Sequence, residues 1–309
     1  MKAIQIHSYG GSDLLSYEET PLPVPGENDV LVRVQAASIN PVDVAFRAGY
    51  MTTYYPLAFP ATLGSDIAGT VEAVGRGVTS IKVGEAVYGR TDLNRLGGYA
   101  EYVITSASEV ARKPTSLNFV QAASIPHVGV TAWRALIDTA GLKAGQTVLI
   151  HAAAGGVGSI AVQLAKSRGA YVIGTASTAN QTFLKELGVD EAIDYTAGPF
   201  EDKVKGVDIV FDTVGGDTQA RSYQCLKPGG ILVSIVEPPS ADTAASHGVR
   251  AAFAMGMPPS ADVLNELTAL IETGKIKPVV STVLPLHEAR RGHDMISTRH
   301  TRGKIILQV

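Results

Sequence analysis

The fold follows from the segment TVLIHAAAGGVGSIAVQLAK, residues 147–166. Thr147–His151 form an apolar run typical of a buried strand. Apolar residues then recur at 157, 160, 161 and 164, which is the spacing of a helix face. Glycines at 155, 156 and 158 lie between the two patterns. We therefore predict a strand, a sharp turn and a helix in immediate succession.

Such a turn can bind a phosphate, because glycines let the backbone approach it closely and the helix N-terminus offers unpaired N–H groups. The alternative is a tight strand-to-helix corner without a ligand. The strand before the turn and the helix after it favour the dinucleotide-binding interpretation. The candidate cofactor-binding residues of the turn are Ala154, Gly155, Gly156, Val157 and Gly158.

Strands and helices alternate beyond this segment. Apolar runs at 170–174, 207–211 and 231–236 are separated by helical patterns, which predicts a parallel sheet with right-handed crossovers. Residues 1–110 instead contain short strands bounded by turns, expected at 2–7, 30–36, 69–75 and 84–89. The prediction is an α/β protein in which a doubly wound Rossmann domain (123–273) is inserted into a β-rich barrel domain (1–122 and 274–309).

Composition narrows the class of protein. The length of 309 residues suits two domains, and a net charge of −3 argues against nucleic acid as a partner. The single cysteine, Cys225, excludes an internal disulfide and favours a reducing compartment, the cytoplasm. Without a run of about 20 apolar residues or an apolar signal core at the N-terminus, we expect no membrane association.

The residues after the second strand indicate which dinucleotide binds. An NAD site places Asp or Glu about 20 residues after the glycine turn, where it binds the ribose 2′-hydroxyl. Residues 175–180 (TASTAN) contain no acid, so Thr175 and Ser177 are candidate donors to a 2′-phosphate. The segment also lacks Arg and Lys, and the alternative is a Ser/Thr loop that caps the next helix. NADPH is the expected cofactor.

Several further blocks occur in a fixed order along nearly the whole chain. They are ASINPVD (37–43), LGSDIAG (63–69), VGVTAW (128–133), DTVGG (212–216), KPGG (227–230) and GKIIL (303–307). With the glycine turn, these blocks resemble the zinc-independent quinone oxidoreductases, the zeta-crystallin type, of the medium-chain dehydrogenase/reductase superfamily. The resemblance implies a GroES-like barrel domain beside the Rossmann domain.

The resemblance also implies roles for individual residues. It places Asn40 at the junction of acceptor and nicotinamide, with Asp43 beside it; the alternative for Asn40 is an Asn-Pro turn. Tyr50, Tyr54 and Tyr55 are candidates to line the acceptor entrance or to supply a proton, and the alternative for them is a packed loop. Where zinc alcohol dehydrogenases of the superfamily have Cys and His ligands, this chain has Asn40 and Ser65, so no metal is expected. The implied nicotinamide neighbours are Thr131, Val214 and Ile235, and Tyr195 is implied near the adenosine.

The resulting functional hypothesis is hydride transfer from NADPH to a quinone or an α,β-unsaturated carbonyl, whose conjugation accepts charge without a strong Lewis acid. An enoyl-thioester reductase is one alternative and would need a basic channel, for which Arg47, Arg290, Arg291 and Arg299 are the candidates. A non-catalytic NADPH-binding protein is the other. The apolar stretch 249–255 is expected to form an edge strand that pairs two copies into a homodimer.

Overall fold

The computed structural model describes residues 1–254 and 261–309. These residues form two compact units. The first unit contains residues 1–127, 261–272 and 278–309, and the second contains residues 128–254 and 273–277. Both ends of the chain therefore belong to the first unit, and the second unit is inserted between them.

The second unit contains a six-stranded sheet in the order β11-β10-β9-β12-β13-β14. All neighbouring strands in it are parallel. Counted in chain order from β9, the strands lie 3-2-1-4-5-6, which is the order of dinucleotide-binding domains. The strands are β9 (Thr147–Ile150), β10 (Tyr171–Ala176), β11 (Glu191–Asp194), β12 (Val207–Asp212), β13 (Leu226–Ser234) and β14 (Arg250–Phe253). The predicted Rossmann fold is confirmed.

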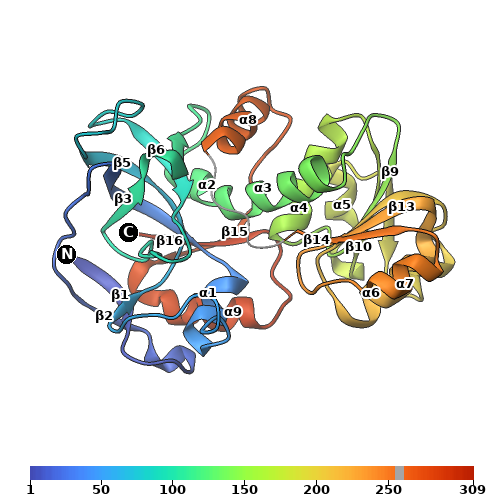
Figure 1. Ribbon diagram of the computed structural model, residues 1–309, viewed down its shortest axis with the longest axis horizontal. Coiled ribbons are helices and arrows are strands. Elements are labelled where there is room, and N and C mark those ends of the chain that lie inside the picture. The colour runs from blue at the N-terminus through green and yellow to red at the C-terminus, as the bar shows by residue number, and fades with distance from the viewer. Residues whose placement is uncertain (255–260) are drawn as a thin grey trace. The chain divides into compact units, whose positions relative to one another are not determined.

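Helices cover this sheet on both sides, with α4 and α5 on one and α6 and α7 on the other (Figure 1). Helix α4 packs on β9 and β10, and α6 packs on β12 and β13. Their bounds are α4 (Gly156–Ser167), α5 (Gln181–Leu187), α6 (Gly216–Ser222) and α7 (Ala241–Ser246). Helix α3 (Pro126–Trp133) and a π-helical segment (Arg134–Thr139) precede β9.

The first unit contains a seven-stranded sheet in the order β15-β16-β3-β5-β6-β8, with β7 also paired to β3, and a small sheet β2-β1-β4. The strands are β1 (Lys2–Ile6), β2 (Ser16–Glu19), β3 (Asp29–Ile39), β4 (Ala61–Thr62), β5 (Asp66–Val74), β6 (Ala86–Arg90), β7 (Tyr102–Ser106), β8 (Val110–Arg112), β15 (Val280–Pro285) and β16 (Lys304–Gln308). The helices are α1 (Pro41–Ala48), α2 (Phe119–Ala123), α8 (Ala261–Glu272) and α9 (Ala289–Ser297). This GroES-like sheet domain was expected from the resemblance.

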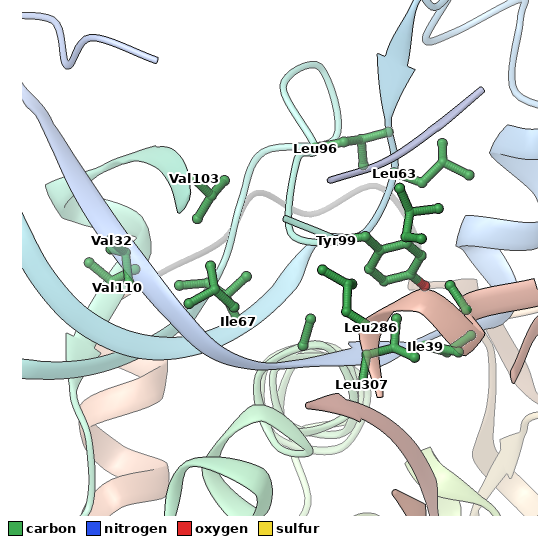
Figure 2. Close-up of a cluster of buried hydrophobic side chains, with 14 of the residues drawn as sticks. Val32, Ile39, Leu63, Ile67, Leu96, Tyr99, Val103, Val110, Leu286 and Leu307 are labelled. Atoms are coloured by element: carbon green, nitrogen blue, oxygen red, sulfur yellow. The ribbon is translucent and has the colours of Figure 1, made fainter. Parts of the chain in front are cut away.

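Strand β3 organises the first unit. Along one edge it pairs with β5, and along the other it pairs first with β7 and then with β16. Apolar side chains of these strands form one core, in which Tyr99 lies among Leu63, Leu96 and Leu286 (Figure 2). Burial of such side chains stabilises each by roughly 1.5–3 kcal/mol. The core thereby holds the carboxyl end of β3 in a fixed place.

Two features differ from the sequence-based expectation. Helix α1 was not predicted, because its eight residues are too few to show periodicity; it begins at Pro41 and ends before Gly49, whose φ is +83°. Helix α8 groups with the first unit, whereas the predicted boundaries placed it in the Rossmann domain. The Tyr88 hydroxyl donates to the Leu264 carbonyl at 2.7 Å, which ties this helix to β6.

Candidate functional site

The glycine turn between β9 and α4 is tied to the neighbouring strand. The Ala153 N–H donates to the Thr175 carbonyl at 2.9 Å, at the end of β10. A Cβ atom on Gly158 would lie 2.3 Å from the Ala152 carbonyl oxygen and 2.7 Å from Ala153 Cα. Only glycine therefore allows the first turn of α4 to approach the end of β9 so closely.

The N-terminus of α4 provides the donors that a dinucleotide needs. Gly155 is the N-cap, and the first helical bond runs from Ser159 N–H to the Gly155 carbonyl at 2.9 Å. The preceding N–H groups of Gly156, Val157 and Gly158 are the ones that a helix leaves unpaired at its start. Together with the partial positive charge of a 12-residue helix, they fit the pyrophosphate of a dinucleotide.

A buried histidine links the ends of three elements beneath this turn. Ser222 donates its hydroxyl hydrogen to the Thr218 carbonyl, so His151 Nε2 donates to Ser222 Oγ at 2.9 Å. His151 Nδ1 then accepts from the Thr175 hydroxyl at 3.1 Å. Burial lowers the pKa of His151 to about 4, which keeps the ring neutral. Thr175, predicted to bind the cofactor, thus directs its hydroxyl into the protein.

Asp212, at the carboxyl end of β12, organises the loop that follows. Its Oδ1 accepts from the N–H groups of Val214 and Gly215, both at 2.9 Å, and its Oδ2 accepts from the Ser234 hydroxyl at 2.8 Å. The predicted nicotinamide neighbour Val214 is exposed, and Ile235 donates its N–H to the Asp212 carbonyl at 3.1 Å. In the sequence Asp212 stands only as part of the motif DTVGG, and that motif does not predict this positioning role.

The remaining cofactor candidates lie in the same unit. Ser177 follows β10, and its hydroxyl oxygen accepts from Asn180 Nδ2 at 3.2 Å. Tyr195 follows β11 with an exposed ring, and Thr131 lies on α3. The ends of β9, β10, β11 and β12 therefore bring together the glycine turn, Ser177, Tyr195 and Val214, as expected for a ligand at the switch point of a parallel sheet.

In the first unit, Asn40 lies fully buried at the end of β3, where it is the N-cap of α1. Its Nδ2 donates to Asp66 Oδ2 at 3.0 Å, and its Oδ1 accepts from Lys304 Nζ. Because an ammonium only donates and a carboxylate only accepts, these partners allow a single orientation of the amide. Sequence analysis predicted contact with the acceptor, and the structure shows an amide held at both ends by charged groups.

Lys304, the first residue of β16, is the buried cation of this cluster. Its Nζ also donates to the Ile39 carbonyl at 3.0 Å and lies 3.8 Å from Asp66 Oδ2. Asp66 in turn accepts from the Ser38 hydroxyl at 2.7 Å and from the His127 N–H at 2.8 Å. Burial lowers the pKa of Lys304, while Asp66 and Asp43 raise it. Neither Lys304 nor Asp66 was among the predicted site residues.

Asp43 completes the cluster. Its Oδ2 accepts from the Asn40 N–H and from the Tyr99 hydroxyl, both at 2.8 Å. Burial raises the pKa of Asp43 to about 7, and the nearby Asp66 adds to the rise, whereas the two hydrogen bonds and Lys304 oppose it. Asp43 is thus a fully buried carboxyl whose protonated form is favoured relative to that of a carboxyl in water.

The predicted tyrosines lie on the turn after α1. Tyr50 is 81% exposed and Tyr54 is 76% exposed, so both rings face solvent. Asn40, Asp43 and Lys304, by contrast, are buried.

The positions that hold zinc ligands in related alcohol dehydrogenases carry other chemistry here. Asn40 binds Lys304 and Asp66, and Ser65 is a buried hydroxyl. In residues 1–254 and 261–309, no group of three or more His, Cys, Asp or Glu side chains has the arrangement of a metal site. Within the same residues, no helix is both long and apolar enough to cross a membrane.

Comparison with known proteins agrees with this geometry. The family model described as alcohol dehydrogenase GroES-like domain matches residues 26–115, and the one described as zinc-binding dehydrogenase matches residues 187–307. Among curated relatives, the zebrafish (Danio rerio) protein "NAD(P)H oxidoreductase RTN4IP1, mitochondrial" is 32% identical and covers 100% of this chain and 91% of its own length.

Solved structures extend the similarity. The quinone oxidoreductase from Coxiella burnetii is 36% identical, with a TM-score of 0.92, and the match covers 100% of this chain and 99% of that one. The Escherichia coli quinone oxidoreductase complexed with NADPH is 32% identical, with a TM-score of 0.88 and full coverage of both chains.

The fold, the glycine turn and these matches define an oxidoreductase of the medium-chain dehydrogenase/reductase superfamily. Within that superfamily, the chain belongs to the quinone oxidoreductase family. The resemblance deduced from the ordered sequence blocks is confirmed.

Proposed function

We propose that this chain reduces quinones or α,β-unsaturated carbonyls with NADPH. Bound NADPH supplies the hydride. The unpaired N–H groups at the start of α4 bind the pyrophosphate, and the loop held by Asp212 supports the nicotinamide end. The acceptor class is inferred from Asn40. Related alcohol dehydrogenases have a metal ligand at this position, whereas Asn40 is hydrogen-bonded to Lys304 and Asp66. Acceptors activated by conjugation suit such a site, since they need no strong Lewis acid.

We further propose that Asn40 positions the acceptor, because its own amide is held in one orientation. Its amide is locked between a cation and an anion, so the end of β3 and the start of α1 keep one geometry. The buried carboxyl of Asp43 holds the Asn40 N–H through its Oδ2, and the exposed hydroxyls of Tyr50 and Tyr54 are proposed to meet the acceptor at its entrance. The predicted contacts of Thr131, Val214, Ile235, Ser177 and Tyr195 with the cofactor belong to the same proposal.

The test is an acceptor panel of quinones, enones, enoyl-CoA and aldehydes, run with stereospecifically 4-deuterated NADPH in ordinary water. We expect hydroquinones from quinones, and saturated ketones with deuterium on the β-carbon from enones. Free semiquinone radicals, or enone reduction without label transfer, would contradict direct hydride transfer. Turnover of enoyl-CoA alone would favour the enoyl-thioester alternative, and NADPH binding without turnover of any acceptor would favour the non-catalytic one.

The same panel tests the position of Asn40. The Asn40→Ala variant is expected to lose about tenfold or more in kcat/KM, because removing a hydrogen-bonding group at an active site typically costs about that much or more. Its affinity for NADPH should stay within about twofold of wild type, since the cofactor contacts lie in the other unit. An unchanged kcat/KM would show that Asn40 is only a structural cap of α1.

One observation weakens the enoyl-thioester alternative. Arg47, one of four candidates for a basic channel, is buried, with its Nε donating to the Gly10 carbonyl at 3.2 Å and its Nη1 3.2 Å from His293 Nδ1. Arg291 pairs with Glu288 at 2.9 Å. These arginines therefore have partners within the protein instead of forming a channel for phosphates.

We propose a homodimer that pairs through β14, the edge strand of the parallel sheet. Its residue Phe253 is exposed, and an uncovered edge favours pairing with a second copy. Of the stretch predicted for this contact, Met255 lies outside the described residues. Light scattering should give twice the 32.3 kDa of one chain, and Phe253→Lys, which places a charge on the edge, should give the monomer. A wild-type monomer at micromolar concentration would refute the proposal.

We also propose a cytoplasmic location, supported by the single buried and unpaired Cys225. The zebrafish relative is named as a mitochondrial protein, so the mitochondrion is the alternative. Cell fractionation with an antibody to the chain distinguishes the two locations.

A further inference from the structure

Asp194 brings a carboxylate to the segment predicted to hold the adenosine end of the cofactor. It is the last residue of β11 and is in register with Ala176, the last residue of β10. Its Oδ2 accepts from the Thr178 hydroxyl at 2.6 Å. Its Oδ1 accepts from the hydroxyl and the N–H of Thr196, at 2.6 and 2.9 Å. The segment 175–180 contains no acid in its sequence, yet it has one beside it in space.

The charge of this carboxylate is preserved. Hydrogen bonds from Thr178 and Thr196 lower the pKa of Asp194, so it is ionised at neutral pH. All three donors are neutral groups and do not cancel its charge.

The cofactor brings a second negative charge to the same place. In a dinucleotide-binding domain the adenosine ribose lies at the end of the second strand, here β10. The 2′-phosphate of NADPH carries about −1.5 to −2 charges at pH 7. The carboxylate and the phosphate therefore repel each other, whereas the 2′-hydroxyl of NADH meets no such opposition.

We propose that Asp194 sets the ratio of NADPH to NADH affinity in this chain, by opposing the 2′-phosphate and thereby keeping NADH usable as a second cofactor. The proposal concerns cofactor binding alone. Asp194 could have no effect on cofactor affinity in an enzyme that does reduce quinones or enones. Equally, Asp194 could set the affinity ratio in a protein that reduces neither.

The test is calorimetric titration of NADPH and NADH into wild type, Asp194→Asn and Glu191→Gln. Asn keeps an acceptor oxygen for Thr196 and removes the charge, so NADPH should bind about tenfold more tightly while NADH changes by less than about twofold. Glu191, the first residue of the same strand, accepts from the Tyr171 hydroxyl at 2.8 Å at the other end of β11. Its substitution removes the same charge and should leave both affinities within about twofold. Equal changes for the two cofactors in Asp194→Asn would overturn the proposal.

Salt provides a test that needs only the wild-type protein. Raising the ionic strength from about 0.1 M to 1 M shortens the screening length from about 10 Å to 3 Å. The NADPH-to-NADH affinity ratio of wild type should then rise, since repulsion is screened, and the advantage of Asp194→Asn should shrink. A ratio that falls with salt would show that attraction dominates at the 2′-phosphate and would refute the role of Asp194.

Discussion

Replacing Lys304 by Met is expected to lower the free energy of unfolding by about 3–5 kcal/mol. The substitution removes the buried cation but leaves the Asp66 carboxyl buried, and it leaves Asn40 Oδ1 and the Ile39 carbonyl without their shared donor. Breaking one half of a buried pair costs this much because the remaining charge loses its counter-ion while it stays out of water. Asp66 keeps the neutral donors Ser38, Asn40 and His127. Urea unfolding followed by circular dichroism measures the change.

A matched control is Lys2→Met in the same unit. Lys2 pairs with Glu19 at 3.2 Å, and both side chains are well exposed, so its loss should cost less than about 1 kcal/mol. Equal effects of the two substitutions, or a Lys304→Met variant as stable as wild type, would mean that the desolvation of Lys304 outweighs its hydrogen bonds. The charged cluster around Asn40 would then not contribute to the free energy of unfolding, and a functional role would be needed to explain it.

Replacing Gly158 by Val is expected to reduce NADPH affinity about 100-fold or more, which corresponds to about 2.7 kcal/mol. The first added carbon would lie 2.3 Å from the Ala152 carbonyl oxygen, which belongs to the backbone and has no rotamer to change. The turn must open, so the N–H groups at the start of α4 no longer point together toward the pyrophosphate. Calorimetric titration with NADPH measures the loss.

The control for this substitution is Ser159→Ala at the next position. It removes a hydroxyl that donates to the Gly156 carbonyl at 3.1 Å and adds no volume, so NADPH affinity should change by less than about threefold. Thermal unfolding of both variants separates loss of binding from loss of the fold. Full NADPH affinity in a folded Gly158→Val protein would show that the cofactor binds elsewhere.

The parallel sheet and its glycine turn could be predicted because their signals are local. Apolar runs, glycines and helical spacing all lie within 20 residues of Thr147. The motif around Asn40 was also recognised, but the partners of Asn40 were not, since Lys304 lies 264 positions away along the chain. Periodicity carries no information about a contact at that separation.

The Thr175–Asn180 segment illustrates a second limit. Its sequence correctly shows no acid, but the pairing of β11 beside β10 brings Asp194 to Thr178. Such a contact depends on strand order and register, which together decide which side chains share an edge of the sheet. Helix α1 shows a third limit, because its ends, Pro41 and Gly49, carry more signal than its short interior.

The pairing of β3 with β16 has a consequence for synthesis on the ribosome. Ile39 of β3 lies opposite Ile305 of β16, and its carbonyl also accepts from Lys304 Nζ, 265 positions away along the chain. At about 5–20 residues per second, translation separates their emergence by on the order of tens of seconds. The whole inserted Rossmann unit emerges in that interval and can fold first, while the edge of β3 at Ala36–Ile39 awaits its partner. Chains that stop before β16 would therefore leave the edge of β3 at Ala36–Ile39 unpaired, and an unpaired strand edge promotes aggregation.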